Sequence, residues 1–195
     1  AKDKEVGRGK ADGSAEGLVD RLRLDQPRVG AVAEALRDIA ALPDPVGEIV
    51  RGSTLANGLQ IRQVRVPMGV VGMIYEARPN VTVDAAGLGL KSGNAVILRG
   101  GKESLVTNQA IALALRAGIV EAGLPEASVQ LVPTIDHPAL LELLQLEGLL
   151  DLCIPRGGEG LIRFVVENAR IPVVKHYKGV CHVYVEKSAD LGRAE

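Results

Sequence analysis

The chain has 195 residues, 47% of them hydrophobic and 24% charged, which is an ordinary composition for a globular fold of one domain or slightly more. Its 23 Lys and Arg against 24 Asp and Glu give a net charge of −1, so no basic excess favours nucleic acid. Aromatic residues make up only 2%, too few for a base-stacking platform. The longest apolar stretch, residues 66–75, is much shorter than the roughly 18 residues of a membrane span. We expect neither a nucleic-acid partner nor a membrane partner.

The N-terminal residues are charged and contain no apolar signal-peptide core, so no secretory signal is predicted. Two cysteines, Cys153 and Cys181, do not make a disulfide framework, and reduced thiols favour a cytoplasmic location. The two cysteines and three histidines show no metal-ligand spacing such as CxxC or HxxxH. No metal site is expected.

Helical periodicity from residue 27 to residue 42 predicts an amphipathic helix. Residues 45–66 then alternate apolar with polar residues around Asn57-Gly58, a strong hairpin signal, and predict a two-stranded arm with one side in solvent. Because such a ribbon is marginally stable alone, we expect it to pack on a partner subunit or on the body of its own domain.

From residue 66 onward, short apolar strands alternate with helices, which indicates an α/β fold with a mainly parallel, Rossmann-like sheet covered by helices on both faces. The predicted strands are 70–75, 95–98, 128–131, 149–154, 172–174 and 182–185. The predicted helices are 82–90, 104–122, 138–147 and 159–168.

Two glycine pairs follow predicted strands and precede predicted helices, where parallel sheets bind ligands. Paired glycines allow backbone N–H groups to approach a phosphate, and the adjacent basic side chains add charge that a 2′-phosphate would use. Neither segment is a GxGxxG fingerprint, so a phosphate-bearing ligand is one reading and an ordinary α/β turn the other. The candidate binding residues are Arg99, Gly100, Gly101, Lys102, Arg156, Gly157 and Gly158.

A third segment, IYEARPNVTVD, crowds polar side chains directly after an apolar strand. Asn80 could donate its amide N–H to a developing oxyanion. The alternative is a capped turn, with Asn80 or Thr82 as the helix N-cap and Arg78 paired with Glu76 or Asp84. Spacing alone leaves both interpretations open.

The fourth segment places Cys181 beside His182, with His176 upstream. A Cys–His nucleophile is one interpretation. Adjacent side chains in a strand point to opposite faces, however, so Cys181 is better explained as a structural thiol. Cys153, within the apolar run LLDLCI, is predicted to be a core residue.

At these same residues the sequence resembles the gamma-glutamyl phosphate reductase family of the aldehyde dehydrogenase superfamily. The resemblance runs through VRVPMGVVGMIYEARPNVTVDAAGLGLKSGNAVILRGGKES, IPRGGEGLIRFVVENA and GVCHVYVEKSADL. It implies reduction of L-glutamyl 5-phosphate by NADPH to L-glutamate 5-semialdehyde with release of phosphate, a step of proline biosynthesis. It places the superfamily's cofactor-binding lysine at Arg99, its glycine-rich turn at residues 156–158 and its oxyanion asparagine at Asn80.

The resemblance also implies a homo-oligomer assembled through the arm of residues 45–66, and glutamate 5-kinase as a candidate partner. It divides the chain into a helical part at 1–44, the arm at 45–66 and a cofactor-binding domain at 67–195. The residues matching the family segment that carries a basic Glu, 176–179, contain no carboxylate, which suits a reductase that releases an aldehyde.

The family's nucleophilic cysteine lies in a segment of the form VCNAxETLL, expected beyond Glu195, while Cys181 matches a different cysteine. We therefore expect a fragment that lacks the catalytic domain and is inactive alone. The alternative is a truncated, catalytically inactive module for nucleotide binding or oligomerisation.

Overall fold

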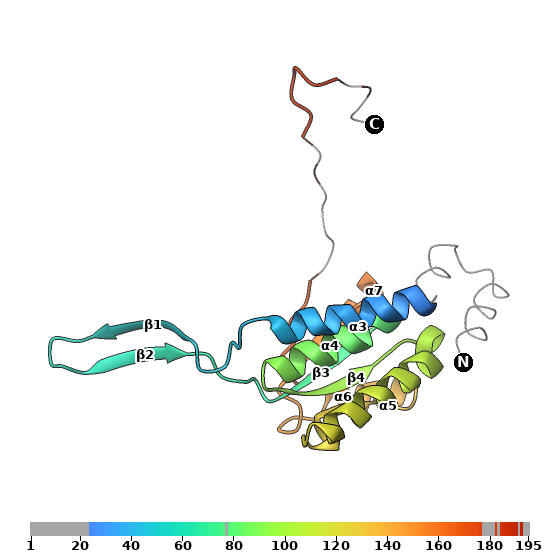
Figure 1. Ribbon diagram of the computed structural model, residues 1–195, viewed down its shortest axis with the longest axis horizontal. Helices are drawn as coiled ribbons and strands as arrows, with labels where there is room; N and C mark the ends of the chain where they lie inside the picture. Colours follow the sequence, from blue (N-terminus) through green and yellow to red (C-terminus); the bar gives the residue numbers. More distant parts are fainter. Residues whose placement is uncertain (1–23, 77, 177–181, 183, 191, 193–195) are drawn as a thin grey trace.

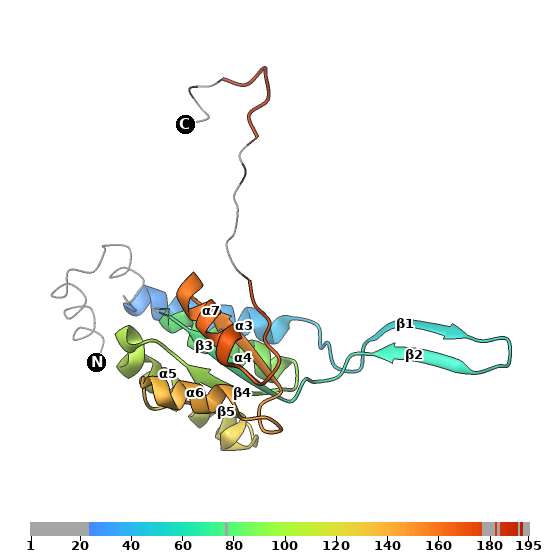
Figure 2. The ribbon, with the colours of Figure 1, turned by 180° about the vertical axis from the view of Figure 1, so that it is seen from behind.

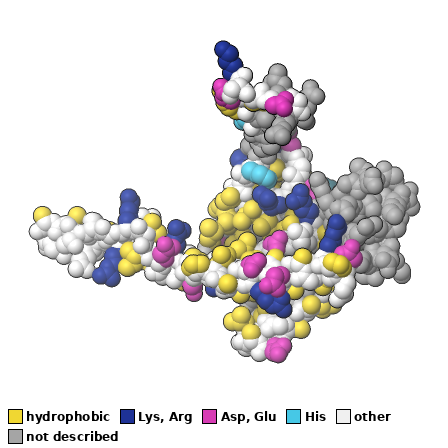
Figure 3. All heavy atoms as spheres, turned by 45° about the horizontal axis from the view of Figure 1, so that its top comes forward, with side chains coloured by type: hydrophobic (Ala, Val, Ile, Leu, Met, Phe, Trp, Pro, Cys, Tyr) yellow, Lys and Arg dark blue, Asp and Glu magenta, His cyan; other side chains and the backbone are white. Residues whose placement is uncertain are grey.

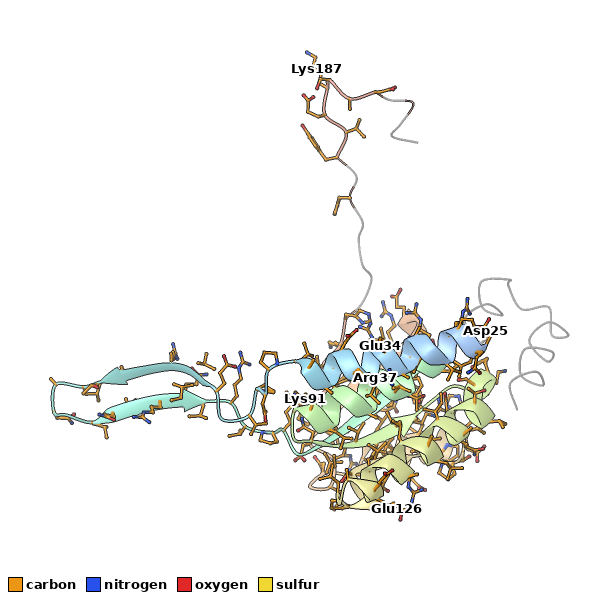
Figure 4. All side chains as sticks on the ribbon, in the orientation of Figure 1. Asp25, Glu34, Arg37, Lys91, Glu126 and Lys187 are labelled. Carbon is orange, nitrogen blue, oxygen red and sulfur yellow. The ribbon has the colours of Figure 1, made fainter. Side chains whose placement is uncertain are left out.

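The computed structural model describes residues 24–76, 78–176, 182, 184–190 and 192. Helix α3 (Gln26–Ala41) has Asp25 as its N-cap, and the Asp25 side chain accepts a hydrogen bond of 3.2 Å from the N–H of Arg28. It confirms the predicted helix at 27–42 and packs on helix α4 (Pro79–Lys91). Lys91 Nζ donates to the carbonyl of Ala40 over 2.9 Å at the end of this pair (Figure 4).

The predicted hairpin forms from strands β1 (Ile49–Thr54) and β2 (Gln60–Val64), which pair antiparallel. Gly58 has φ +87°, which its missing side chain permits, and Asn57 Oδ1 accepts from the N–H of Leu59 over 3.1 Å. Every residue of both strands is exposed, and the hairpin extends away from the body (Figure 1). The expectation of packing on its own domain is wrong, since alternation predicts a ribbon without saying what covers it.

Four parallel strands form the sheet in the order β5-β4-β3-β6, which confirms the predicted fold class. They are β3 (Val70–Tyr75), β4 (Ala95–Arg99), β5 (Val129–Leu131) and β6 (Leu152–Arg156). The chain winds outward from β3 through β4 to β5 and then crosses back to place β6 on the other side of β3. This reversal makes the gap between β3 and β6 the topological switch point.

Helices cover both faces of the sheet (Figures 1 and 2). Helices α4 and α5 (Leu105–Glu121) lie on one face, and α6 (His137–Leu144) and α7 (Glu159–Asn168) lie on the other. Short 3-10 turns, η1 (Lys102–Ser104) and η2 (Glu126–Ser128), precede α5 and β5.

Alternation along β3 divides its side chains between two cores. Ile74 packs with Leu144 and Val165 under α6 and α7, whereas Tyr75 packs with Ala86 under α4 and α5. Burial of each large aliphatic side chain contributes about 1.5–3 kcal/mol relative to exposure. The two cores together fix the strand ends that carry the candidate site.

The predicted boundaries differ from the structure chiefly after α6. Strand β6 begins at Leu152 rather than at residue 149, because the N–H groups of Leu149 and Leu150 bond back to Leu146 in a turn. The predicted strand at 172–174 is reduced to an isolated parallel bridge between Val173 and Cys153. In the predicted strand at 182–185, the described residues are not in a strand.

No helix in the described part of the chain combines the length and the apolar character needed to cross a bilayer.

Candidate site at the carboxyl edge of the sheet

The carboxyl ends of three strands meet at one edge of the sheet, opposite the edge from which the hairpin arm leaves (Figure 1). Arg99 ends β4 and Arg156 ends β6, one on each side of β3. Their strands are separated by two inter-strand spacings, or about 10 Å. The topology therefore brings together the two glycine-rich turns that lie 57 residues apart in the sequence (156 − 99).

Glu76 joins the end of β3 to the turn after β6. Its N–H donates to the carbonyl of Arg156 over 3.2 Å, and its carboxylate accepts from the N–H of Gly158 over 2.8 Å. Gly158 is the N-cap of α7, so a carboxylate occupies the positive end of this helix dipole. A Cβ on Gly157 would lie 2.5 Å from Glu76 Oε2, so a side chain there would displace this carboxylate. The backbone N–H of this turn thus binds a negatively charged oxygen.

Arg99, the last residue of β4, lies half-buried beside the turn and donates from Nη2 to the carbonyl of Ile135 over 2.7 Å. Burial lowers the pKa of its guanidinium, while the negative charges of Glu103 and Glu76 raise it. Lys102, three residues further along, is exposed. Two cations therefore flank this turn, one fixed against the loop before α6 and one in solvent.

Gly100 and Gly101 are both buried, so this turn is not simply an exposed phosphate loop. A Cβ on Gly100 would lie 2.2 Å from Asn108 Nδ2 and 3.4 Å from a ring carbon of Tyr75. The need for glycine at this position comes from packing against Asn108, a reason that the sequence pattern did not reveal.

The loop that receives Arg99 borders an open hollow of about 680 Å³ that sequence reasoning missed. Its lining residues are Ile135, Asp136, His137, Pro138, Ala139 and Glu142. The His137 ring meets Phe164 of α7 edge to face, with ring centroids 5.5 Å apart. The carboxyl edge therefore offers both cations and a recess.

The segment after β3 was open to two interpretations, an oxyanion site at Asn80 or a turn capped by Asn80 or Thr82. The described part of this segment does not show that capped turn. Helix α4 begins at Pro79, with Arg78 as an N-cap that makes no side-chain cap hydrogen bond. Asn80 is exposed in the first helical turn, and Thr82 is buried within the helix, so neither is the N-cap. The pairing of Arg78 with Glu76 or Asp84 that belonged to this alternative is not found among the described residues, where the Glu76 carboxylate accepts from Gly158.

Cys153 is a core residue, as predicted. It is fully buried, and burial raises the pKa of its thiol to about 12, so it is no nucleophile at neutral pH. Cys181 lies outside the described residues. His176 reaches Arg156 Nη1 with Nε2 at 3.4 Å, which places that histidine at the carboxyl edge too.

A second hollow, of about 460 Å³, lies away from this edge on the sheet face beside the base of the arm. Figure 3 shows a continuous hydrophobic area on this side of the body. Most residues that line this second hollow are apolar, including Met68, Met73, Leu88 and Ile154. Arg65 lies in this lining, but Arg99, Lys102, Arg156 and the two glycine pairs do not, so we assign the candidate site to the carboxyl edge.

No protein-family model matches the sequence. Gamma-glutamyl phosphate reductase of Xanthomonas axonopodis pv. citri (strain 306) is 57% identical over 194 residues, which is 100% of this chain and 46% of that protein. The crystal structure of gamma-glutamyl phosphate reductase from Thermotoga maritima matches 99% of this chain and 47% of its own with a TM-score of 0.90 and 44% identity.

An acetylating aldehyde dehydrogenase from Geobacillus thermoglucosidasius shares the fold at a TM-score of 0.59 and 19% identity, over 73% of this chain and 30% of its own. The fold is therefore that of the aldehyde dehydrogenase superfamily. Within it, the chain belongs to the gamma-glutamyl phosphate reductase family. It spans about half the length of the curated relatives it matches.

Proposed function

We propose that the chain is the nucleotide-binding part of an acyl-phosphate reductase. NADPH and a proton reduce L-glutamyl 5-phosphate to L-glutamate 5-semialdehyde, releasing phosphate and NADP⁺ in proline biosynthesis. The observation that carries this proposal is the 57% identity to a gamma-glutamyl phosphate reductase along the entire chain. The convergence of Arg99, Arg156 and the α7 N-terminus at one sheet edge supports it.

The residues at the carboxyl edge fit a dinucleotide. The Gly158 N–H already holds a carboxylate oxygen, which stands in for a phosphate oxygen, and the Gly157 position has no room for a side chain. In this proposal Gly157 and Gly158 present backbone donors to a phosphate group. Arg99 and Lys102, with the backbone of Gly100 and Gly101, bind the nucleoside half, and Arg156 adds a further cation. NADPH, when bound, supplies the hydride.

Asn80 is proposed to hold the acyl oxygen of the substrate through its amide N–H. Its exposed place in the first turn of α4, after the carboxyl end of β3, leaves this amide available. A thiolate attacks the acyl phosphate in the family's chemistry, and Cys153 does not supply it because it is buried and protonated. The proposed nucleophile is a cysteine outside residues 1–195, with Cys181 in a structural role.

The remaining parts of the proposal concern organisation. We assign residues 1–44 to a helical part, 45–66 to an oligomerisation arm and 67–195 to the cofactor-binding domain; residues 1–23, 77, 177–181, 183, 191 and 193–195 of this division lie outside the described residues. The arm's exposed strands support a homo-oligomer. Glutamate 5-kinase is the proposed partner because it makes the labile substrate, and the cytoplasm is the proposed location.

The proposal is tested with the natural protein that carries this sequence. Phosphate-dependent reduction of NADP⁺ by L-glutamate 5-semialdehyde is the expected activity in the reverse direction, and an intact protein that binds NADPH but never shows it would contradict the reaction. The inactive-module alternative makes a different prediction. It requires an intact mass of about 20.5 kDa, whereas a mass near twice that value excludes it.

A further inference from the structure

Four buried polar side chains form a continuous hydrogen-bonded chain beneath the turn after β4. Tyr75 Oη lies 2.7 Å from Thr82 Oγ1, Thr82 Oγ1 donates to Asn108 Oδ1 over 3.0 Å, and Asn108 Nδ2 donates to Ser104 Oγ over 3.1 Å. Each of the four is at most 1% exposed. The chain links the end of β3, the second turn of α4, the start of α5 and the turn η1.

The direction of donation follows from the number of protons available. Thr82 has one hydroxyl proton, which it donates to Asn108, so the Tyr75 hydroxyl must donate to Thr82. Burial raises the pKa of Tyr75 to about 12, which keeps that donor protonated. Every link therefore has a defined orientation, and removing one member takes away a hydrogen-bond partner from a buried polar atom of each neighbour.

Asn108 is the member that contacts the candidate ligand turn. Its Nδ2 would lie only 2.2 Å from a Cβ atom on Gly100. The same nitrogen donates a hydrogen bond to Ser104 Oγ within η1 (Lys102–Ser104). Asn108 thus supports the turn at both of its ends without itself reaching the edge, because it is fully buried.

We propose that Asn108 and Thr82 are positioning residues that set the conformation of the Gly100–Ser104 turn and thereby the affinity for a phosphate-bearing nucleotide. This rests on the proposed nucleotide-binding function. Neither side chain needs to touch the ligand. They act by holding the backbone donors and Lys102 in one arrangement, and a displacement of about 1 Å is enough to lose much of a bound geometry.

The test uses adenosine 2′,5′-bisphosphate as the probe, titrated calorimetrically into the natural protein that carries this sequence. Asn108→Ala and Thr82→Val are expected to weaken binding about tenfold, and Thr82→Ser, which keeps the hydroxyl, restores binding to within about twofold. Asn94→Ala is the matched control. Asn94 is also a buried amide, but it accepts from the N–H groups of Met68 and Gly69 at the opposite edge of the sheet.

Asn94→Ala should destabilise the chain as Asn108→Ala does, yet leave the dissociation constant within about twofold. A second measurement, hydrogen exchange of the backbone amides of residues 101–104, should accelerate in Asn108→Ala and Thr82→Val but not in Asn94→Ala. Equal dissociation constants for wild type and Thr82→Val, or equal weakening by Asn94→Ala, would overturn the positioning role.

Failure of the wild-type protein to bind the probe contradicts the proposed nucleotide-binding function, but not the claim that Asn108 and Thr82 set the conformation of the turn. Exchange in residues 101–104 then decides the positioning role alone, and unchanged exchange in both Asn108→Ala and Thr82→Val overturns it.

Discussion

The carboxylate of Glu76 accepts a hydrogen bond of 2.8 Å from the backbone N–H of Gly158, although the two residues lie 82 positions apart in the sequence. This contact joins β3 to the N-terminus of α7 across the switch point of the sheet. A negative charge thereby occupies the place where the proposed function puts a ligand phosphate. The ligand and Glu76 compete for the same donor.

Replacing Glu76 with Gln should therefore tighten nucleotide binding. The substitution keeps an acceptor oxygen for Gly158 but removes a charge that repels the phosphate, an effect of about 1 kcal/mol at 4 Å in water. We expect NADPH to bind about threefold to tenfold more tightly to Glu76→Gln at low salt. Glu126→Gln, at the start of η2, is the control; Glu126 pairs with Arg116 away from the carboxyl edge, so this substitution should leave the dissociation constant for NADPH unchanged (Figure 4). Weaker binding by Glu76→Gln would show that Glu76 helps to hold the ligand instead.

Gly100→Ala should destabilise the chain by about 1–3 kcal/mol, because the new methyl group meets the immobile Asn108 side chain at 2.2 Å. Gly160→Ala is the matched control in α7, where no atom lies within 4 Å of the new Cβ. That substitution should be neutral or stabilising by up to about 1 kcal/mol. Urea unfolding of both variants measures the difference, and equal stabilities would refute the packing reason for Gly100.

The fold could be predicted because its strands are short apolar runs. They alternate with segments whose apolar residues recur at the spacing of a helix. The two glycine turns after Arg99 and Arg156 could also be located, since each glycine pair directly follows a predicted strand. The contact between Glu76 and Gly158 could not be predicted, because it depends on which strand lies beside β3. One of the two interpretations of this segment paired Arg78 with Glu76 or Asp84, whereas in the structure the Glu76 carboxylate accepts from the N-terminus of α7. Local sequence patterns identify the turns, whereas the order of the strands in the sheet determines which residues contact them.

Removal of the hairpin arm should leave the stability of the α/β body nearly unchanged. Replacing residues 49–64 with a short Gly/Ser linker removes only exposed strands, so the free energy of unfolding should change by less than about 1 kcal/mol. The assembly state measured by sedimentation should fall, because the proposed interface is lost. An unchanged oligomer after this deletion would contradict an oligomerisation role for residues 45–66.

The buried thiol of Cys153 predicts a loss of stability at high pH. Its ordinary pKa of 9.0 is raised to about 12 by burial, so between these values the unfolded chain releases a proton that the folded chain retains. The contribution of this thiol to the free energy of unfolding is therefore fully present below pH 9. Between pH 9 and about pH 12 it falls by about 1.4 kcal/mol per pH unit. Cys153→Ala should show a shallower decline in urea unfolding from pH 8 to about pH 11. Parallel pH profiles for the two proteins would mean that the thiol is not protected by burial.

The central claim, that the carboxyl edge binds a nicotinamide dinucleotide bearing a 2′-phosphate, is tested most directly by calorimetric titration of the natural protein that carries this sequence with NADPH and with NADH. One charge-assisted contact to the 2′-phosphate from Arg99 or Lys102 contributes about 1.5–3 kcal/mol, so NADPH should bind at least about tenfold more tightly. Equal dissociation constants for the two nucleotides, or no binding of either, would contradict the claim.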